Sequence, residues 1–122
     1  MISRTMRCSE LTDLIRKLRR FAAERDWDQF HSPKNIAMAL SVEVSEILEH
    51  FQWLTEQQSN RMSQRKLAEV TDEIGDVLIY LLRLSDKLGV DPLDAAHRKL
   101  RQNSRKYPVH KAKGTAKKYN EL

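Results

Sequence analysis

The chain has few of the features on which secreted, membrane-spanning or disulfide-linked proteins depend. Its 122 residues include one cysteine, Cys8, so an internal disulfide and a cysteine-rich zinc site are both excluded. The longest strongly apolar run, residues 77–82, is far too short to cross a bilayer, and the N-terminus lacks the apolar stretch of a signal peptide. We therefore expect a cytoplasmic protein that makes no contact with a membrane.

Glycine and proline are equally scarce, at three residues each, and no alternating strand pattern persists along the chain. Both observations predict an all-α fold, built as one domain over residues 1–122 with two antiparallel central helices. Apolar residues recur at helical spacing in four stretches, which predicts helices at about 9–27, 33–54, 63–88 and 92–106.

Capping residues mark the ends of these four predicted helices. The expected N-caps are serines and an aspartate, two of them followed by proline at the first helical position: Ser9, Ser32, Ser63 and Asp91. The third helix should end at Gly89, just after Lys87. No apolar period follows Pro108, so we expect residues 108–122, which contain four lysines, to form a basic tail.

Two acidic couplets lie inside the apolar stretches of the central helices. Glu43 and Glu46 are three residues apart, as are Glu73 and Asp76, so each pair shares one face of its helix and borders the apolar arc. On antiparallel helices the two pairs also lie at the same level. Four carboxylates held together repel one another unless protons or a cation intervene. The spacing therefore predicts a divalent metal site, and oxygen-only ligands suit Mg²⁺ or Mn²⁺.

Two other interpretations compete with this metal site. A single Glu-x-x-Glu couplet is most often a solvated helix face. A di-iron bundle needs Glu-x-x-His on two helices, but the residue three before His50 is Ile47. The nearest imitation, Asp94 and His97, is expected to be an exposed turn of the fourth helix.

Aromatic residues stand at the ends of the predicted helices. Trp27 closes the first helix and Trp53 closes the second, where an indole ring is either a lid on the core or a platform for a nucleobase. Position alone slightly favours the core. Tyr80 follows Asp76 by one turn on the acidic side and adds a possible aromatic or hydroxyl contact.

A net charge of +5 and a sequence pI near 9.5 are compatible with nucleic acid and also with small anions such as nucleotides. A basic helical module that binds nucleic acid without catalysis is therefore the alternative function. The strongest pattern in the chain is anionic, however, and would repel a phosphate backbone. This pattern argues against nucleic acid as a partner.

Specific sequence segments carry a family resemblance over nearly the whole chain, from about residue 11 to 122. They are DWDQFH at 26–31, EVSE at 43–46, HFQW at 50–53, DEIGDVLIY at 72–80, KYPV at 106–109 and KGTAKKY at 113–119. The chain resembles the MazG-like nucleotide pyrophosphohydrolases, and among these the dCTP pyrophosphatase branch most. The resemblance implies an all-α homodimer or homotetramer that hydrolyses a nucleoside triphosphate to the monophosphate and pyrophosphate with Mg²⁺.

The resemblance also assigns roles to individual residues. The metal ligands of the family match the four acids of the two couplets, and among these we take Glu46 as the candidate for orienting the attacking water. Residues that contact the nucleotide in the dCTP branch match Trp27, Trp53, Tyr80, Lys99 and Asn103. One position departs from the pattern, because Leu18 replaces a histidine of the animal enzymes, which predicts a different base or sugar preference.

Overall fold

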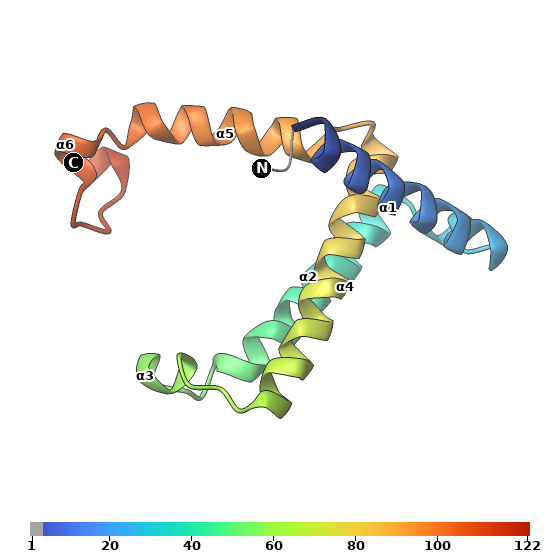
Figure 1. Ribbon diagram of the computed structural model, residues 1–122, viewed down its shortest axis with the longest axis horizontal. Coiled ribbons are helices and arrows are strands. Elements are labelled where there is room, and N and C mark those ends of the chain that lie inside the picture. The colour runs from blue at the N-terminus through green and yellow to red at the C-terminus, as the bar shows by residue number, and fades with distance from the viewer. Residues whose placement is uncertain (1–3) are drawn as a thin grey trace. The chain divides into compact units, whose positions relative to one another are not determined.

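The computed structural model describes residues 4–122, with side chains from Glu10 onward, and this part of the chain contains helices and no strands (Figure 1). The predicted all-α fold is confirmed. The elements are α1 (Arg4–Glu24), η1 (Asp28–Phe30), α2 (Pro33–Phe51), α3 (Glu56–Ser59), α4 (Gln64–Leu88), α5 (Pro92–Lys106), α6 (Val109–Ala112) and η2 (Tyr119–Glu121). None of these helices combines the length and the apolar character that crossing a bilayer requires.

These elements form two compact units. The first unit ends at Val90 and holds α1 to α4, whereas the second, Asp91–Leu122, holds α5, α6 and η2. The two couplets and both tryptophans belong to the first unit. That the whole chain forms one domain stays a prediction.

An antiparallel hairpin of α2 and α4 dominates the first unit, and Figure 1 shows the two helices side by side. The predicted caps are present on both: Ser32 accepts a hydrogen bond from the Asn35 N–H (3.1 Å), and Ser63 accepts one from the Lys66 N–H (3.2 Å). The buried apolar side chains of the two helices are Ile36 on α2 and Val70 and Leu82 on α4.

The hairpin leaves many large apolar side chains uncovered in the single chain. On α2, Met38 and Leu48 are 58% and 59% exposed, and on α4 Leu67 and Ile74 are both 55% exposed. An apolar surface of this extent is unusual for an isolated soluble unit.

Helix α1 packs against α4 and differs from its predicted bounds at both ends. It begins at Arg4, so the expectation that Ser9 caps it is wrong; residues 4–8 contain no glycine or proline to prevent the helix from extending. It ends at Glu24, where Asp26 adopts a left-handed φ of 53°. The N–H groups of Asp26 and Trp27 donate to the carbonyls of Ala23 (3.1 Å) and Ala22 (2.9 Å), which is the Schellman pattern.

Two short helices and two 3-10 turns were not expected. α2 ends at Phe51, not near residue 54. α3 then begins with a capping box in which Thr55 and Gln58 bond each other's backbone N–H groups. The residues expected to form a basic tail contain α6 and η2, and the Tyr119 ring contacts Tyr107 edge-on at 6.1 Å. In the same unit Asp91 caps α5 as expected, accepting from the Leu93 and Asp94 N–H groups.

Candidate active site

The acidic couplets face each other across the α2–α4 hairpin. Burial raises the pKa of the Glu43 carboxyl; a hydrogen bond with Glu46 raises it further, and so do the charges of Glu46, Asp76 and Glu73. The four acids therefore share one electrostatic environment, which we call the acidic cluster. The two couplets thus lie near each other, as their common level on antiparallel helices predicts.

Two buried oxygens of the acidic cluster accept no hydrogen bond. They are Glu43 Oε2 and Glu73 Oε2. Nε2 of His50 lies 2.8 Å from Glu73 Oε2, but the contact lacks hydrogen-bond geometry and is an ion pair only when the imidazole is protonated. Buried carboxylate oxygens without donors are costly, and a hard cation satisfies such oxygens.

The donor set therefore fits a divalent metal ion of the Mg²⁺ or Mn²⁺ type. Across residues 10–122, no three histidine, cysteine, aspartate or glutamate side chains already converge as a finished ligand set. Binding an ion would thus need rotations of these carboxylates, which long flexible glutamates permit. The role of the four acids as ligands stays a prediction.

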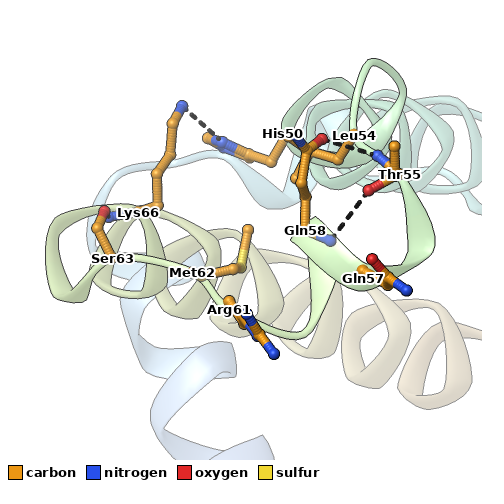
Figure 2. A pocket seen from close by; sticks show the side chains of 9 residues that line it. All are labelled: His50, Leu54, Thr55, Gln57, Gln58, Arg61, Met62, Ser63 and Lys66. Atoms are coloured by element: carbon orange, nitrogen blue, oxygen red, sulfur yellow. Dashed lines mark hydrogen bonds between the residues drawn. The ribbon is translucent and has the colours of Figure 1, made fainter.

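A pocket of about 650 Å³ adjoins the acidic cluster at the turn end of the hairpin (Figure 2). His50 joins the two, because its Nε2 faces Glu73 while its Nδ1 lies 3.5 Å from Lys66 Nζ. Figure 2 shows Lys66 and His50 meeting on one side of the pocket and the Thr55–Gln58 capping box on another. The pocket thus brings a cationic side chain close to the acids.

A smaller cavity of about 80 Å³ lies toward the other end of the hairpin, and we call it the aromatic cavity. Trp27 and Tyr80 both line it, so two of the predicted base contacts lie together. Tyr80 follows Asp76 by one turn of α4, about 6 Å along the helix, which places the cavity beside the acidic cluster. Leu18, the position that departs from the family pattern, lines the same cavity.

Trp53 is not part of this cavity. It follows the C-terminal end of α2, whereas Trp27 precedes the N-terminal end, and the 19 residues of α2 span about 28 Å. Its side chain is 87% exposed, so the alternative that it is a core lid is wrong for the single chain. One chain does not bring both tryptophans to one base.

Lys99 and Asn103 lie on α5 in the second unit, and both are exposed. The Asn103 carbonyl accepts the N–H of Tyr107, the C-cap residue of α5, at 2.8 Å. Their contact with a nucleotide stays a prediction.

A buried arginine, Arg83, forms part of the wall of the aromatic cavity and is not among the residues predicted from the sequence. Only 4% of Arg83 is exposed, and its Nη2 donates to Asp28 Oδ1 (3.1 Å) and to His31 Nδ1 (3.0 Å). Hydrogen bonds from Lys87 and then Arg83 lower the pKa of Asp28. Burial, and next the Arg83 charge, lower the pKa of His31. The available signal was a charged residue inside the apolar run of residues 81–84.

The chain is similar to known proteins in both sequence and structure. The MazG-like family model matches residues 38–122, which include all four acids. Human dCTP pyrophosphatase 1 is 44% identical over 114 residues, covering 92% of this chain and 67% of that protein; the cattle protein is 43% identical, covering 92% and 68%. A crystal structure of a pyrophosphatase from Archaeoglobus fulgidus is 43% identical, with a TM-score of 0.77 over 81% of this chain and 93% of its own. The family model matches well over half of this chain, and the dCTP pyrophosphatase relatives match most of it. The chain therefore belongs to the MazG-like family.

Proposed function

We propose that this protein hydrolyses dCTP, or a modified dCTP, to the nucleoside monophosphate and pyrophosphate with the help of Mg²⁺. The coarser statement, that it is a nucleotide pyrophosphohydrolase, follows from its family and from 41–44% identity to proteins named dCTP pyrophosphatase 1. The choice of dCTP rests on the names of those relatives and on the sequence resemblance.

The observation that carries the proposal is the acidic cluster with its two buried oxygens that accept no hydrogen bond, Glu43 Oε2 and Glu73 Oε2. The four acids would hold the metal ion, which makes the α-phosphorus more electrophilic and offsets the negative charge of the leaving pyrophosphate. Without such a cation, the cluster would repel a triphosphate.

We assign the water-orienting role to Glu46. Its carboxylate accepts a proton from the water as the oxygen bonds to the α-phosphorus, and the bond from that phosphorus to the bridging oxygen of the β-phosphate breaks. The bridging oxygen leaves with the pyrophosphate, and the proton on Glu46 returns to solvent. Glu46 is partly accessible, which lets water reach it.

The aromatic cavity is the proposed base site, because Trp27 and Tyr80 offer flat faces there and Tyr80 lies one helical turn from Asp76. Trp53 would reach the same base only from another copy of the chain, which agrees with a proposed homodimer or homotetramer. The pocket beside Glu73 presents Lys66 and offers room for the distal phosphates. Lys99 and Asn103 are proposed to complete the nucleotide contacts.

A panel of nucleoside triphosphates, assayed with Mg²⁺ for both monophosphate and pyrophosphate, tests the proposal. We expect equal amounts of the two products, fastest turnover with dCTP or a modified dCTP, and loss of turnover in EDTA that Mg²⁺ restores. Release of single phosphates, or no turnover of any triphosphate, would refute it. A mobility-shift assay with single- and double-stranded nucleic acid, run in parallel, detects the alternative function.

A further inference from the structure

Arg83 connects helix α4 to the segment that carries Trp27. This segment, residues 25–31, is the connection between α1 and α2, and apart from partly exposed His31 all of its residues are exposed. Arg83 is the buried partner, with 5% of its side chain exposed against 61% for Asp28. Lys87, one turn later on α4, donates to the same Asp28 oxygen at 2.5 Å. Two cations of α4 therefore hold one carboxylate of the segment.

The contact with His31 has a further consequence. A guanidinium group can only donate, so His31 Nδ1 must accept the 3.0 Å hydrogen bond from Arg83 Nη2. In the neutral ring the proton then resides on Nε2. Arg83 thus selects one tautomer of a histidine that lines the aromatic cavity.

Stability alone does not explain an arginine at this position. Its Nε is buried without a hydrogen-bond partner, which is unfavourable, and a buried ion pair is often no more stabilising than an apolar side chain of similar size. Substituting methionine for it would also leave no orphaned charge. Asp28 would keep Lys87. Asp86, whose Oδ2 lies 3.8 Å from Arg83 Nη1, would keep its two hydrogen bonds from Arg19.

We propose that Arg83 is a positioning residue of the base site: it fixes the Trp27 and His31 walls of the aromatic cavity to α4 and sets the tautomer of His31. This inference rests on the proposed function in placing the base in that cavity. Arg83 acts through Asp28 and His31 and makes no contact with the reacting atoms.

Arg83→Met tests this role through the separation of KM from kcat. We expect KM for the preferred triphosphate to rise about tenfold while kcat stays within about twofold, because ground-state binding of the base is impaired and the acidic cluster is untouched. Arg83→Lys should give an intermediate KM, since one ammonium group can hold Asp28 or His31 but not both in the same geometry.

Two readouts do not depend on turnover. Long-range ¹H–¹⁵N NMR of the His31 ring, assigned with His31→Gln, should show a single Nε2–H tautomer in the unsubstituted protein and a mixture in Arg83→Met. In a Trp53→Phe background Trp27 is the remaining tryptophan, and Arg83→Met should make its fluorescence more accessible to acrylamide.

Arg19→Met is the matched control, because Arg19 directs two hydrogen bonds to Asp86 on α4, and Asp86 keeps its ion pair with Arg83 Nη1 (3.8 Å) when Arg19 is replaced. It should leave KM, the tautomer and the quenching unchanged. The proposal is overturned if Arg83→Met changes KM no more than the control does, or lowers only the melting temperature. If the unsubstituted protein hydrolyses no triphosphate, the proposed function fails instead, and the tautomer and quenching still decide whether Arg83 holds the two walls.

Discussion

At the scale of single residues, the acidic cluster works against the stability of the metal-free protein. Glu43 shows this most clearly, because burial and three neighbouring acids all raise its pKa. A carboxyl whose folded pKa is raised contributes stability below its unfolded pKa and loses it as the pH rises through the folded pKa. At neutral pH the Glu43 carboxylate is therefore unfavourable for folding.

Glu43→Gln should consequently raise the melting temperature measured in EDTA while lowering Mg²⁺-dependent turnover by about two orders of magnitude. The amide removes the charge and keeps the shape. Glu49→Gln, at an exposed position of the same helix, is the matched control and should change neither quantity. Near-normal turnover in any two glutamine or asparagine variants of the acidic cluster would refute the four-carboxylate site.

His31 makes the folding stability depend on pH with the opposite sign. Burial and the Arg83 charge lower its pKa below the ordinary 6.5, although the Asp28 charge opposes them. The folded state thus favours the neutral ring, whose stabilising contribution is present above about pH 6.5 and is lost as the pH falls through the folded pKa.

We therefore expect the melting temperature of the unsubstituted protein to fall below about pH 6.5 more steeply than that of His31→Gln. Thermal unfolding followed by circular dichroism between pH 7.5 and about 5 measures the difference. The exposed His97, changed to glutamine, serves as the control. Parallel curves for His31→Gln and the unsubstituted protein would show that His31 does not stay neutral.

At the scale of helices and turns, alanine variants of the two tryptophans distinguish stacking on a nucleobase from packing in the core. Trp53 is 87% exposed, so Trp53→Ala should leave the melting temperature nearly unchanged. Trp27 contacts Phe21 edge-on at 5.6 Å, a pair that contributes about 1 kcal/mol, so Trp27→Ala should lower the melting temperature modestly.

Both tryptophan variants should weaken nucleotide binding by about 1–3 kcal/mol per lost stack, seen as a raised KM. Titration with dCTP and Ca²⁺, which is intended to permit binding without turnover, should quench the tryptophan fluorescence of the unsubstituted protein. Unchanged fluorescence at saturating nucleotide would refute the assignment of the base site.

The elements that sequence predicts well are those with local signals. Ser32, Ser63 and Asp91 cap their helices, and Gly89 ends α4, because each acts on its own backbone neighbours. The level of the acidic couplets follows from helical geometry alone. The α3 helix, by contrast, is too short for an apolar period, although its Thr55–Gln58 capping box stands in the sequence.

Other features depend on residues far apart in the chain, and local patterns do not reveal them. Arg83 and Asp28 are 55 positions apart, so their ion pair cannot be inferred from spacing. The separation of Trp27 from Trp53 follows once α2 is known to be continuous. The expected Ser9 cap failed because a capping residue favours a helix start without requiring one.

At the scale of the whole molecule, the exposed apolar side chains of α2 and α4 indicate a partner surface. Leu48 is 59% exposed and lies on the side of α2 away from the acids, about 140° around the helix from Glu43. We expect light scattering to show a dimer or tetramer at micromolar concentration. A compact, active monomer would contradict this.

Leu48→Lys should shift the protein toward monomer, because a desolvated lysine is costly at an apolar interface. If Trp53 reaches the base only from another copy, the same change should raise KM. Val109→Lys, at a 74% exposed position of α6, is a control with the same chemical change and should alter neither property.

The turns that end α1 and α4 share the Schellman backbone pattern, but a different type of residue takes the left-handed position in each. Gly89, at φ 66°, adopts the left-handed conformation freely, whereas Asp26, at φ 53°, has a side chain that disfavours it. The direction in which Trp27 leaves α1 is therefore set by the torsion angles of its neighbour as well as by packing. Asp26→Gly should leave the melting temperature nearly unchanged. Glycine adopts the left-handed conformation without strain, which offsets the loss of the hydrogen bond from Gln29 to the Asp26 carboxylate. A β-branched residue at this position should change the direction of the indole and alter base selectivity without touching the nucleotide. Residue 26 would then influence specificity from outside the base site.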